Sequence, residues 1–153
     1  MKKILSALFI GIGVAFGMGS LALAADAIDP AVGTWKLNLV KSKFAADAAP
    51  KSKLRTYAQT AQSMSLKIVG VAPDGTPISI QTSYKFDGID YPWTGTPGVD
   101  ALSVTHVDAS TLNYALKNNG KIVATGTRKV SADGKVLTIS GSAANELEVY
   151  DKQ

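Results

Sequence analysis

The amino-acid sequence predicts an all-β fold: a single antiparallel up-and-down β-barrel of about eight to ten strands, behind an N-terminal signal peptide. Apolar and polar residues alternate with a period of two from residue 33 onward, which indicates strands with one buried face. About ten such runs are separated by turn residues, at the spacing of a barrel or a sandwich. The turns are tight and no long crossover connection is evident, which favours the up-and-down barrel over the sandwich.

The first 24 residues indicate a secretory signal. Met1-Lys2-Lys3 supplies the positive charge, residues 4–23 are uncharged and mostly apolar, and Ala22-Leu23-Ala24 fits a cleavage site. The expected domains are therefore a signal peptide at 1–24 and a barrel domain at 25–153. The alternative is an uncleaved anchor, because the apolar run is long enough to span a bilayer. We expect cleavage, and a mature protein in the periplasm or outside the cell without a stable membrane anchor.

The composition excludes several functional classes. The chain has no cysteine, which excludes disulfides, thiolate catalysis and cysteine-ligated metals. Without the signal, 14 basic residues stand against 12 acidic ones, a balance that does not indicate nucleic-acid binding. A domain of about 130 residues buries roughly two-thirds of its unfolded surface, so a hydrophobic core alone can hold it.

The first strand begins at Gly33, which allows a tight start to the strand. Trp35, Leu37 and Leu39 share one face of this strand, and we expect that face to be buried. A loop ended by a proline follows. Pro92 restricts the fifth strand to an edge or rim of the sheet. The strands expected after the first are 53–60, 64–71, 78–86 and 89–94.

Turn chemistry organises the second half of the chain. Asn119-Gly120 and Asp133-Gly134 are two-residue hairpin signals, as is Asp87-Gly88 before them, because these residue types tolerate positive φ. The strands expected between and after these turns are 102–107, 111–117, 121–130, 136–140 and 147–150.

The Gly33-Thr34-Trp35 start resembles that of the lipocalins and fatty-acid-binding proteins, the calycin-type β-barrels. Other motifs resemble a group of small exported bacterial lipocalin-like proteins of uncharacterised function, over nearly the whole chain after the signal. This resemblance implies the barrel fold and export, and no particular activity. The motifs are Thr34-Trp35-Lys36-Leu37-Asn38, Lys41-Ser42-Lys43-Phe44, Tyr84-Lys85-Phe86-Asp87-Gly88, Asp133-Gly134-Lys135 and Val149-Tyr150-Asp151-Lys152.

The fatty-acid-binding proteins hold their ligand's carboxylate with an Arg-x-Tyr near the C-terminus. In this sequence Tyr150 matches the tyrosine, but Glu148 stands at the position of the arginine. The resemblance therefore does not carry this carboxylate site over. The loop at 45–50 is also too short for the two-helix lid of that family.

Trp35 and Arg128 are expected to close one end of the barrel. Arg128 shares a strand face with Ile122 and Val130, and an inward arginine needs a partner because an unpaired buried charge is costly. In lipocalins an arginine from a late strand lies across the tryptophan. The resemblance thus implies a cation–π contact between Arg128 and Trp35, a structural role that we favour over ligand contact.

Aromatic residues with a polar tip are the main candidate ligand-binding residues: Tyr57, Tyr84, Trp93 and Tyr114. Tyr84 and Tyr114 occupy the more apolar faces of their strands and are expected to point inward, with Trp93 near the mouth. A barrel of about eight strands holds either side chains or one small ligand, so a filled core and an open pocket both stay possible.

Two further residues complete the candidate set. His106 is the only histidine and lacks evident partners for a metal site or a catalytic triad, so a core or rim role is favoured over ligand contact. Arg55 shares a face with Tyr57, and the sequence leaves open which face is inside. If Arg55 points inward, an anionic ligand becomes plausible.

The sequence therefore predicts an exported lipocalin-like barrel that binds a small apolar or aromatic molecule in its interior. The alternative is a non-binding structural or interaction protein of the cell envelope with a side-chain-filled barrel. The sequence shows no acid, base and nucleophile that would come together in one catalytic site, so we do not expect an enzyme. We also expect no metal and no cofactor. A cavity of about 300 Å³ or more would favour a ligand.

Overall fold

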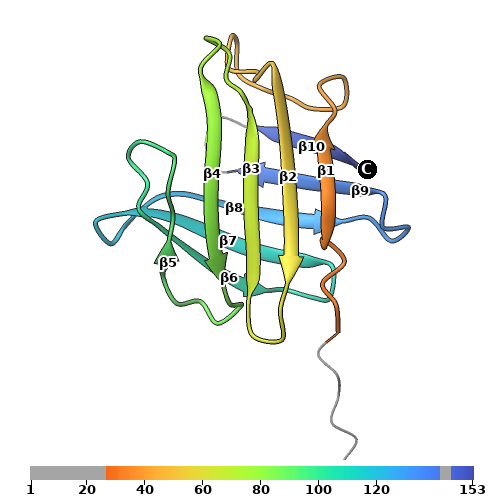
Figure 1. The fold of residues 1–153 in the computed structure, drawn as a ribbon, viewed down its shortest axis with the longest axis vertical. Coiled ribbons are helices and arrows are strands. Elements are labelled where there is room, and N and C mark those ends of the chain that lie inside the picture. Colours follow the sequence, from red (N-terminus) through yellow and green to blue (C-terminus); the bar gives the residue numbers. More distant parts are fainter. Residues whose placement is uncertain (1–26, 142–145) are drawn as a thin grey trace, which may run out of the picture.

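The computed structural model describes residues 27–141 and 146–153, which contain ten β-strands and no helix (Figure 1). The expected signal peptide and its cleavage after Ala24 lie outside the described residues. Within them, no helix is long and apolar enough to cross a membrane. The strands are β1 (Gly33–Leu37), β2 (Ser52–Gln59), β3 (Met64–Val71), β4 (Pro77–Tyr84), β5 (Tyr91–Pro92), β6 (Ala101–His106), β7 (Thr111–Asn118), β8 (Lys121–Val130), β9 (Val136–Gly141) and β10 (Leu147–Lys152).

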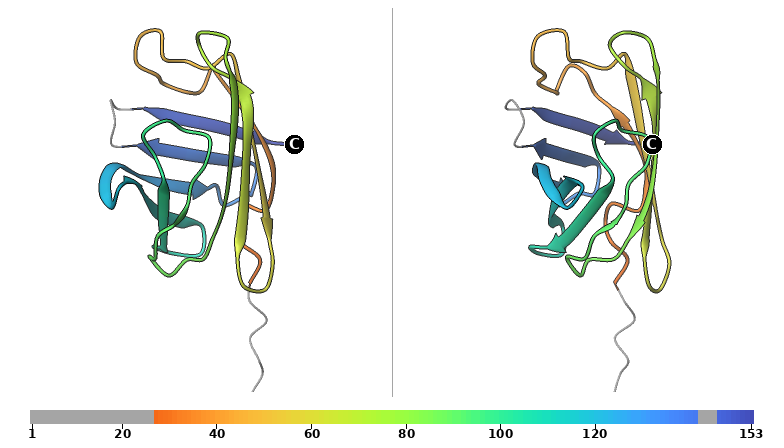
Figure 2. Two further views of the ribbon diagram at one scale, coloured as in Figure 1. Left: turned by 60° about the vertical axis from the view of Figure 1, so that its left-hand side comes forward. Right: turned by 90° about the vertical axis from the view of Figure 1, so that its left-hand side faces the viewer.

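The strands form one antiparallel sheet in the order β4-β3-β2-β1-β10-β9-β8-β7-β6-β5. Neighbours along the chain pair as a meander, and β1 pairs with β10, so the N-terminal and C-terminal strands lie side by side. In Figure 1, β1 to β4 run down the front and the later strands cross behind them; the side views of Figure 2 show these two walls facing each other. The predicted up-and-down antiparallel barrel is confirmed.

The two edges of the sheet, β4 and β5, almost meet and nearly close the barrel. Gln81 and Thr94 form an isolated antiparallel bridge across this seam. The Thr82 hydroxyl donates to the carbonyl oxygen of Pro92 at 2.8 Å. Pro92 lies in the edge strand β5, as the sequence predicts. An edge strand tolerates proline, because its outer side does not need the backbone N–H that proline lacks.

Alternation predicts most of the strand boundaries to within two residues, but the first strand is shorter than expected. It ends at Leu37, because Asn38 starts a turn in which its side-chain oxygen accepts from the Lys41 N–H and its carbonyl oxygen accepts from the Ser42 N–H. Leu39 is therefore 46% exposed, and its expected burial is wrong.

The expected inner face of β8 is also wrong at one end. The pairing of β7 with β8 shifts by one residue between Leu116 and Lys117, so that Lys117 pairs with Ile122 while Leu116 pairs with Ala124. Such a bulge moves the residues beyond it to the other face of the sheet. Ile122 is 62% exposed, whereas Arg128 and Val130 on the near side of the bulge are buried as expected.

The core lies between the two walls, on the inner faces of the strands. Its largest fully buried side chains include a tryptophan, a tyrosine and an arginine besides aliphatic residues. The interior of the barrel therefore contains polar groups as well as apolar ones, and the candidate site is built from both. These side chains are Trp35, Arg128, Tyr150, Met64, Ile68, Leu137 and Val130.

Candidate functional site

The interior of the barrel holds a cavity of about 370 Å³. Most of its lining is aliphatic or aromatic, and the charged residues in the lining are Lys53, Arg55, Arg128 and Glu146. Of the predicted ligand-binding residues, all but His106 line this cavity: Arg55, Tyr57, Tyr84, Trp93 and Tyr114. Their side chains come from β2, β4, β7 and the loop after β5, so only the folded barrel brings them together. Their role in binding stays a prediction.

Trp93 is placed by the loop that follows β5. Its indole Nε1 donates to the Thr96 hydroxyl at 2.9 Å, and both residues line the cavity. Gly95 between them has φ +96°, and a Cβ there would lie 2.0 Å from the carbonyl oxygen of Ser79 on β4. Only glycine allows the loop that carries Trp93 to approach β4 this closely.

Tyr114 and Tyr84 both face inward, as expected, on opposite walls. Tyr114 pairs with Gly126, and a Cβ on Gly126 would fall 2.3 Å from the Tyr114 hydroxyl oxygen. The missing side chain therefore lets the Tyr114 ring lie along the wall and leaves the lumen open. Tyr84 is 3% exposed, and burial raises the pKa of its hydroxyl above the ordinary value.

Arg128 is buried and inward, but its partners differ from the expected one. Its Nη2 donates to both carboxylate oxygens of Asp29, at 2.8 and 2.6 Å. Its guanidinium lies 5.5 Å from the ring centroid of Tyr57, whereas the cation over the Trp35 ring is Lys152, at 5.1 Å. The expected stacking of Arg128 on Trp35 is therefore wrong. The guanidinium instead pairs with the Asp29 carboxylate, which carries the opposite charge.

Trp35 and Arg128 nevertheless belong to one closing unit, which we define as Asp29, Ala31, Trp35 and Arg128. The Trp35 Nε1 donates to the Ala31 carbonyl oxygen at 2.7 Å, and the Ala31 N–H donates to the Asp29 carboxylate at 2.8 Å. The segment before β1 thus crosses the end of the barrel and connects the tryptophan to the arginine.

A second ionic cluster joins side chains of β2 to side chains of β10. Glu148 accepts from Lys53 and from Arg55 Nη2, the latter at 3.2 Å, and from the Tyr150 hydroxyl at 2.6 Å. Arg55 Nε donates to the Tyr150 oxygen at 2.9 Å. Arg55 therefore points inward, which answers the question that the sequence leaves open.

The charges in this cluster determine its protonation. Burial disfavours the charged form of Glu148 and by itself would raise its pKa. The positive charges of Arg55 and Lys53 and the hydrogen bonds to the carboxylate outweigh the effect of burial and lower the pKa of Glu148 to about 2. Burial raises the pKa of the Tyr150 hydroxyl, which stays a donor. Glu148 is therefore an anion that is held between two cations.

Sequence reasoning missed three members of these clusters: Asp29, Lys53 and Glu148. A signal exists for Glu148, because it stands two residues from Tyr150 on one strand and therefore shares its face. Lys53 bears the same relation to Arg55. Asp29 precedes the first strand, so no periodicity points to it.

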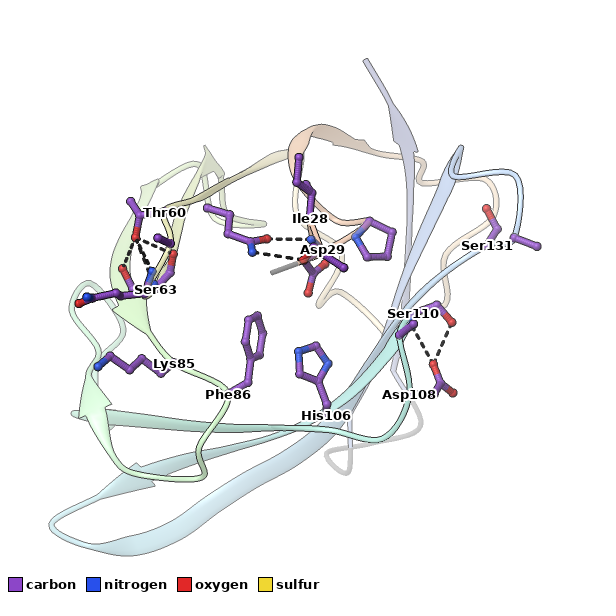
Figure 3. Close-up of a pocket in the computed structure, with 17 residues that line it drawn as sticks. Ile28, Asp29, Thr60, Ser63, Lys85, Phe86, His106, Asp108, Ser110 and Ser131 are labelled. Atoms are coloured by element: carbon purple, nitrogen blue, oxygen red, sulfur yellow. Dashed lines mark hydrogen bonds between the residues drawn. The ribbon is translucent and has the colours of Figure 1, made fainter. Parts of the chain in front are cut away.

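His106 lies outside the interior cavity, in a groove of about 670 Å³ at the end of the barrel where the N-terminal segment crosses. Figure 3 shows Phe86 and His106 side by side, pointing toward Asp29 and Ile28. Their ring centroids are 4.1 Å apart. Within 27–141 and 146–153, His106 makes no hydrogen bond or ion pair, and no group of three or more residues could hold a metal ion.

Several solved structures resemble this chain. Wild-type fluorescent protein UnaG matches with a TM-score of 0.55 and 24% identity, over 80% of this chain and 96% of UnaG. A single-site mutant of UnaG matches with a TM-score of 0.57 and 22% identity, over 83% of this chain and 99% of the mutant. At these identities the similarity shows the fold alone, a nearly closed antiparallel β-barrel. No protein-family model and no curated protein matches the chain.

Proposed function

We propose that this protein is exported and binds one small apolar or aromatic molecule in the barrel interior. The observation that carries the proposal is the cavity of about 370 Å³, which exceeds the roughly 300 Å³ at which ligand pockets begin. The alternative, a structural protein with a filled barrel, would have no such cavity. Apolar side chains line most of the volume, so an apolar ligand would replace water there at a gain in free energy.

The aromatic residues suit such a ligand. Tyr57, Tyr84 and Trp93 present ring surfaces to the cavity, and rings of this kind pack against flat apolar ligands with offset or edge contacts. Trp93 belongs to the loop at the seam, where the cavity is bounded by a loop rather than by paired strands. A ligand entering there would contact this ring.

Binding is tested with the neutral probe N-phenyl-1-naphthylamine. We expect binding at tens of micromolar or tighter, together with a change in tryptophan fluorescence. The chain has two tryptophans, and Trp35 is not among the residues that line the cavity. Trp93→Phe should therefore abolish the change in protein fluorescence while the probe still binds.

Tyr114→Leu changes one side chain of the cavity wall. It should alter the probe's affinity by about threefold or more, with the far-UV circular dichroism unchanged, because the leucine keeps an apolar group at a similar volume. If no probe binds at about 50 μM to the wild-type protein, the barrel interior is not a ligand site and the filled-barrel alternative takes its place.

Export is tested on the protein from its native envelope fraction. N-terminal sequencing should begin at Ala25, because the small residues at 22 and 24 fit the specificity of signal peptidase. An intact Met1 on membrane-bound protein would contradict cleavage and support the anchor.

A further inference from the structure

Among the described residues, Lys53 is the only lysine that lines the interior cavity. Its side chain is 17% exposed, and the rings of Tyr57, Tyr84 and Trp93 line the same cavity. An ammonium group that is taken from water into such a place loses hydration at a cost in free energy. Contact with an apolar ligand needs no amine, so apolar binding alone gives no reason for a lysine at this position.

The surroundings of Lys53 favour its neutral amine. Lys53 and Arg55 both pair with Glu148, so that one carboxylate faces two cations. Burial lowers the pKa of Lys53 below its ordinary value and outweighs the opposing effect of Glu148, and the positive charge of Arg55 lowers this pKa further. A desolvated lysine beside another cation is one of the arrangements by which proteins activate an amine to attack a carbonyl carbon.

The two oxygens of Glu148 have different partners. Oε2 accepts from Arg55 Nη2 at 3.2 Å and from the Tyr150 hydroxyl at 2.6 Å, whereas Oε1 accepts from Lys53 Nζ. The bonds to Oε2 hold the carboxylate in place without the help of Lys53. Glu148 is therefore a fixed anion with one oxygen directed at the Lys53 nitrogen, in the position of a counter-ion for a cation formed there.

We propose that Lys53 binds an apolar or aromatic aldehyde covalently in this cavity, as a protonated imine whose counter-ion is Glu148. The Lys53 nitrogen forms a bond to the aldehyde carbon, and the carbon–oxygen bond breaks. The oxygen leaves as water with two of the three hydrogens of the ammonium group. The third hydrogen stays on the nitrogen and donates to Glu148 Oε1, so the ion pair keeps its charges. This inference rests on the proposed function, since it names the ligand class of the same cavity.

The experiment uses 4-dimethylaminocinnamaldehyde, an uncharged aromatic aldehyde, with the wild-type protein near neutral pH. We expect an absorbance band at a longer wavelength than that of the free aldehyde, because protonation of the imine draws electrons along the conjugated chain. Reduction with cyanoborohydride converts the imine to a stable amine, and peptide mass spectrometry locates it. Lys53 should be labelled at least about tenfold faster than Lys51, which is exposed and does not line the cavity.

Lys53→Arg is the matched variant. It keeps a positive charge beside Glu148, but a guanidinium does not lose its proton and forms no imine. The variant should lose the long-wavelength band and the label at position 53, while N-phenyl-1-naphthylamine still binds within about threefold of the wild-type affinity. Lys51→Gln should leave the band and the label at Lys53 unchanged.

Glu148→Gln tests the counter-ion. Without the carboxylate the imine should lose its proton, because a buried cation without a counter-ion is disfavoured, and the long-wavelength band should disappear. If this variant does not fold, the peptide map of the wild-type protein and the Lys53→Arg variant still test the imine itself.

The outcomes separate the two proposals. Equal labelling of Lys53 and Lys51, or a band that persists in Lys53→Arg, would overturn the imine, and binding of N-phenyl-1-naphthylamine would leave the proposed function intact. An unchanged band in folded Glu148→Gln would overturn the role of Glu148. Failure of both the aldehyde and N-phenyl-1-naphthylamine to bind the wild-type protein would overturn the proposed function and this inference with it.

Discussion

Replacement of Arg128 by alanine should lower the free energy of unfolding by about 3–5 kcal/mol, the range observed when one partner of a buried ion pair is removed. Asp29 would stay buried without its counter-ion, and the contact between the guanidinium and the Tyr57 ring would be lost as well. Urea denaturation followed by tryptophan fluorescence measures the change, because Trp35 belongs to the same closing unit.

Lys129→Ala is the matched control. Lys129 is the next residue along β8 and points to the outer, exposed face, so its removal should change the free energy of unfolding by less than about 0.5 kcal/mol. Equal denaturation midpoints for the two variants would show that the Asp29–Arg128 pair does not hold this end of the barrel. The double variant Asp29→Asn, Arg128→Met should recover part of the lost stability, because it leaves no unpaired buried charge.

Acid should destabilise the barrel through Glu148 by about 3 kcal/mol. The folded protein holds the pKa of this carboxylate at about 2, below the ordinary value of 4.5 that we take for the unfolded chain. A depressed folded-state pKa means that the unfolded chain takes up the proton first. The stabilisation is therefore present in full above pH 4.5 and is lost progressively as the pH falls toward 2.

Comparison with Glu148→Gln isolates this contribution. The variant should be less stable than the wild-type protein near pH 6, because Lys53 and Arg55 lose their counter-ion, and the difference should shrink as the pH falls from 4.5 toward 2. Asp47→Asn serves as the control, since Asp47 is exposed and has a positive φ that asparagine tolerates. A difference between Glu148→Gln and wild type that is independent of pH would contradict the assignment.

The strands and turns were largely predictable from the sequence because they depend on local chemistry. The runs at 64–71 and 121–130 match β3 and β8 in both boundaries, since a period of two marks a half-buried strand wherever the fold places it. Asn119 and Gly120 adopt φ of 49° and 75°, the positive values that this pair favours in a two-residue hairpin. The meander order of the strands follows from these short turns.

Local chemistry was insufficient where a strand carries polar residues on both faces or where the pairing is irregular. The sequence leaves the face of Arg55 open, because its strand alternates weakly. Alternation predicts Ile122 inside, because no sequence signal marks the bulge at this end of the strand. In both places the burial of a side chain depends on the register of the neighbouring strand.

The partners of the interior charges were decided by the tertiary structure alone. Arg128 meets Asp29 across 99 residues of sequence, and Arg55 meets Glu148 across 93. A period of two tells which side chains face inward, but the barrel's closure determines which of them meet. By itself the sequence determined the strands, the turns and an aromatic interior. Only closure of the barrel paired its cations with carboxylates, because a charge that is buried without an opposite charge beside it is costly in free energy.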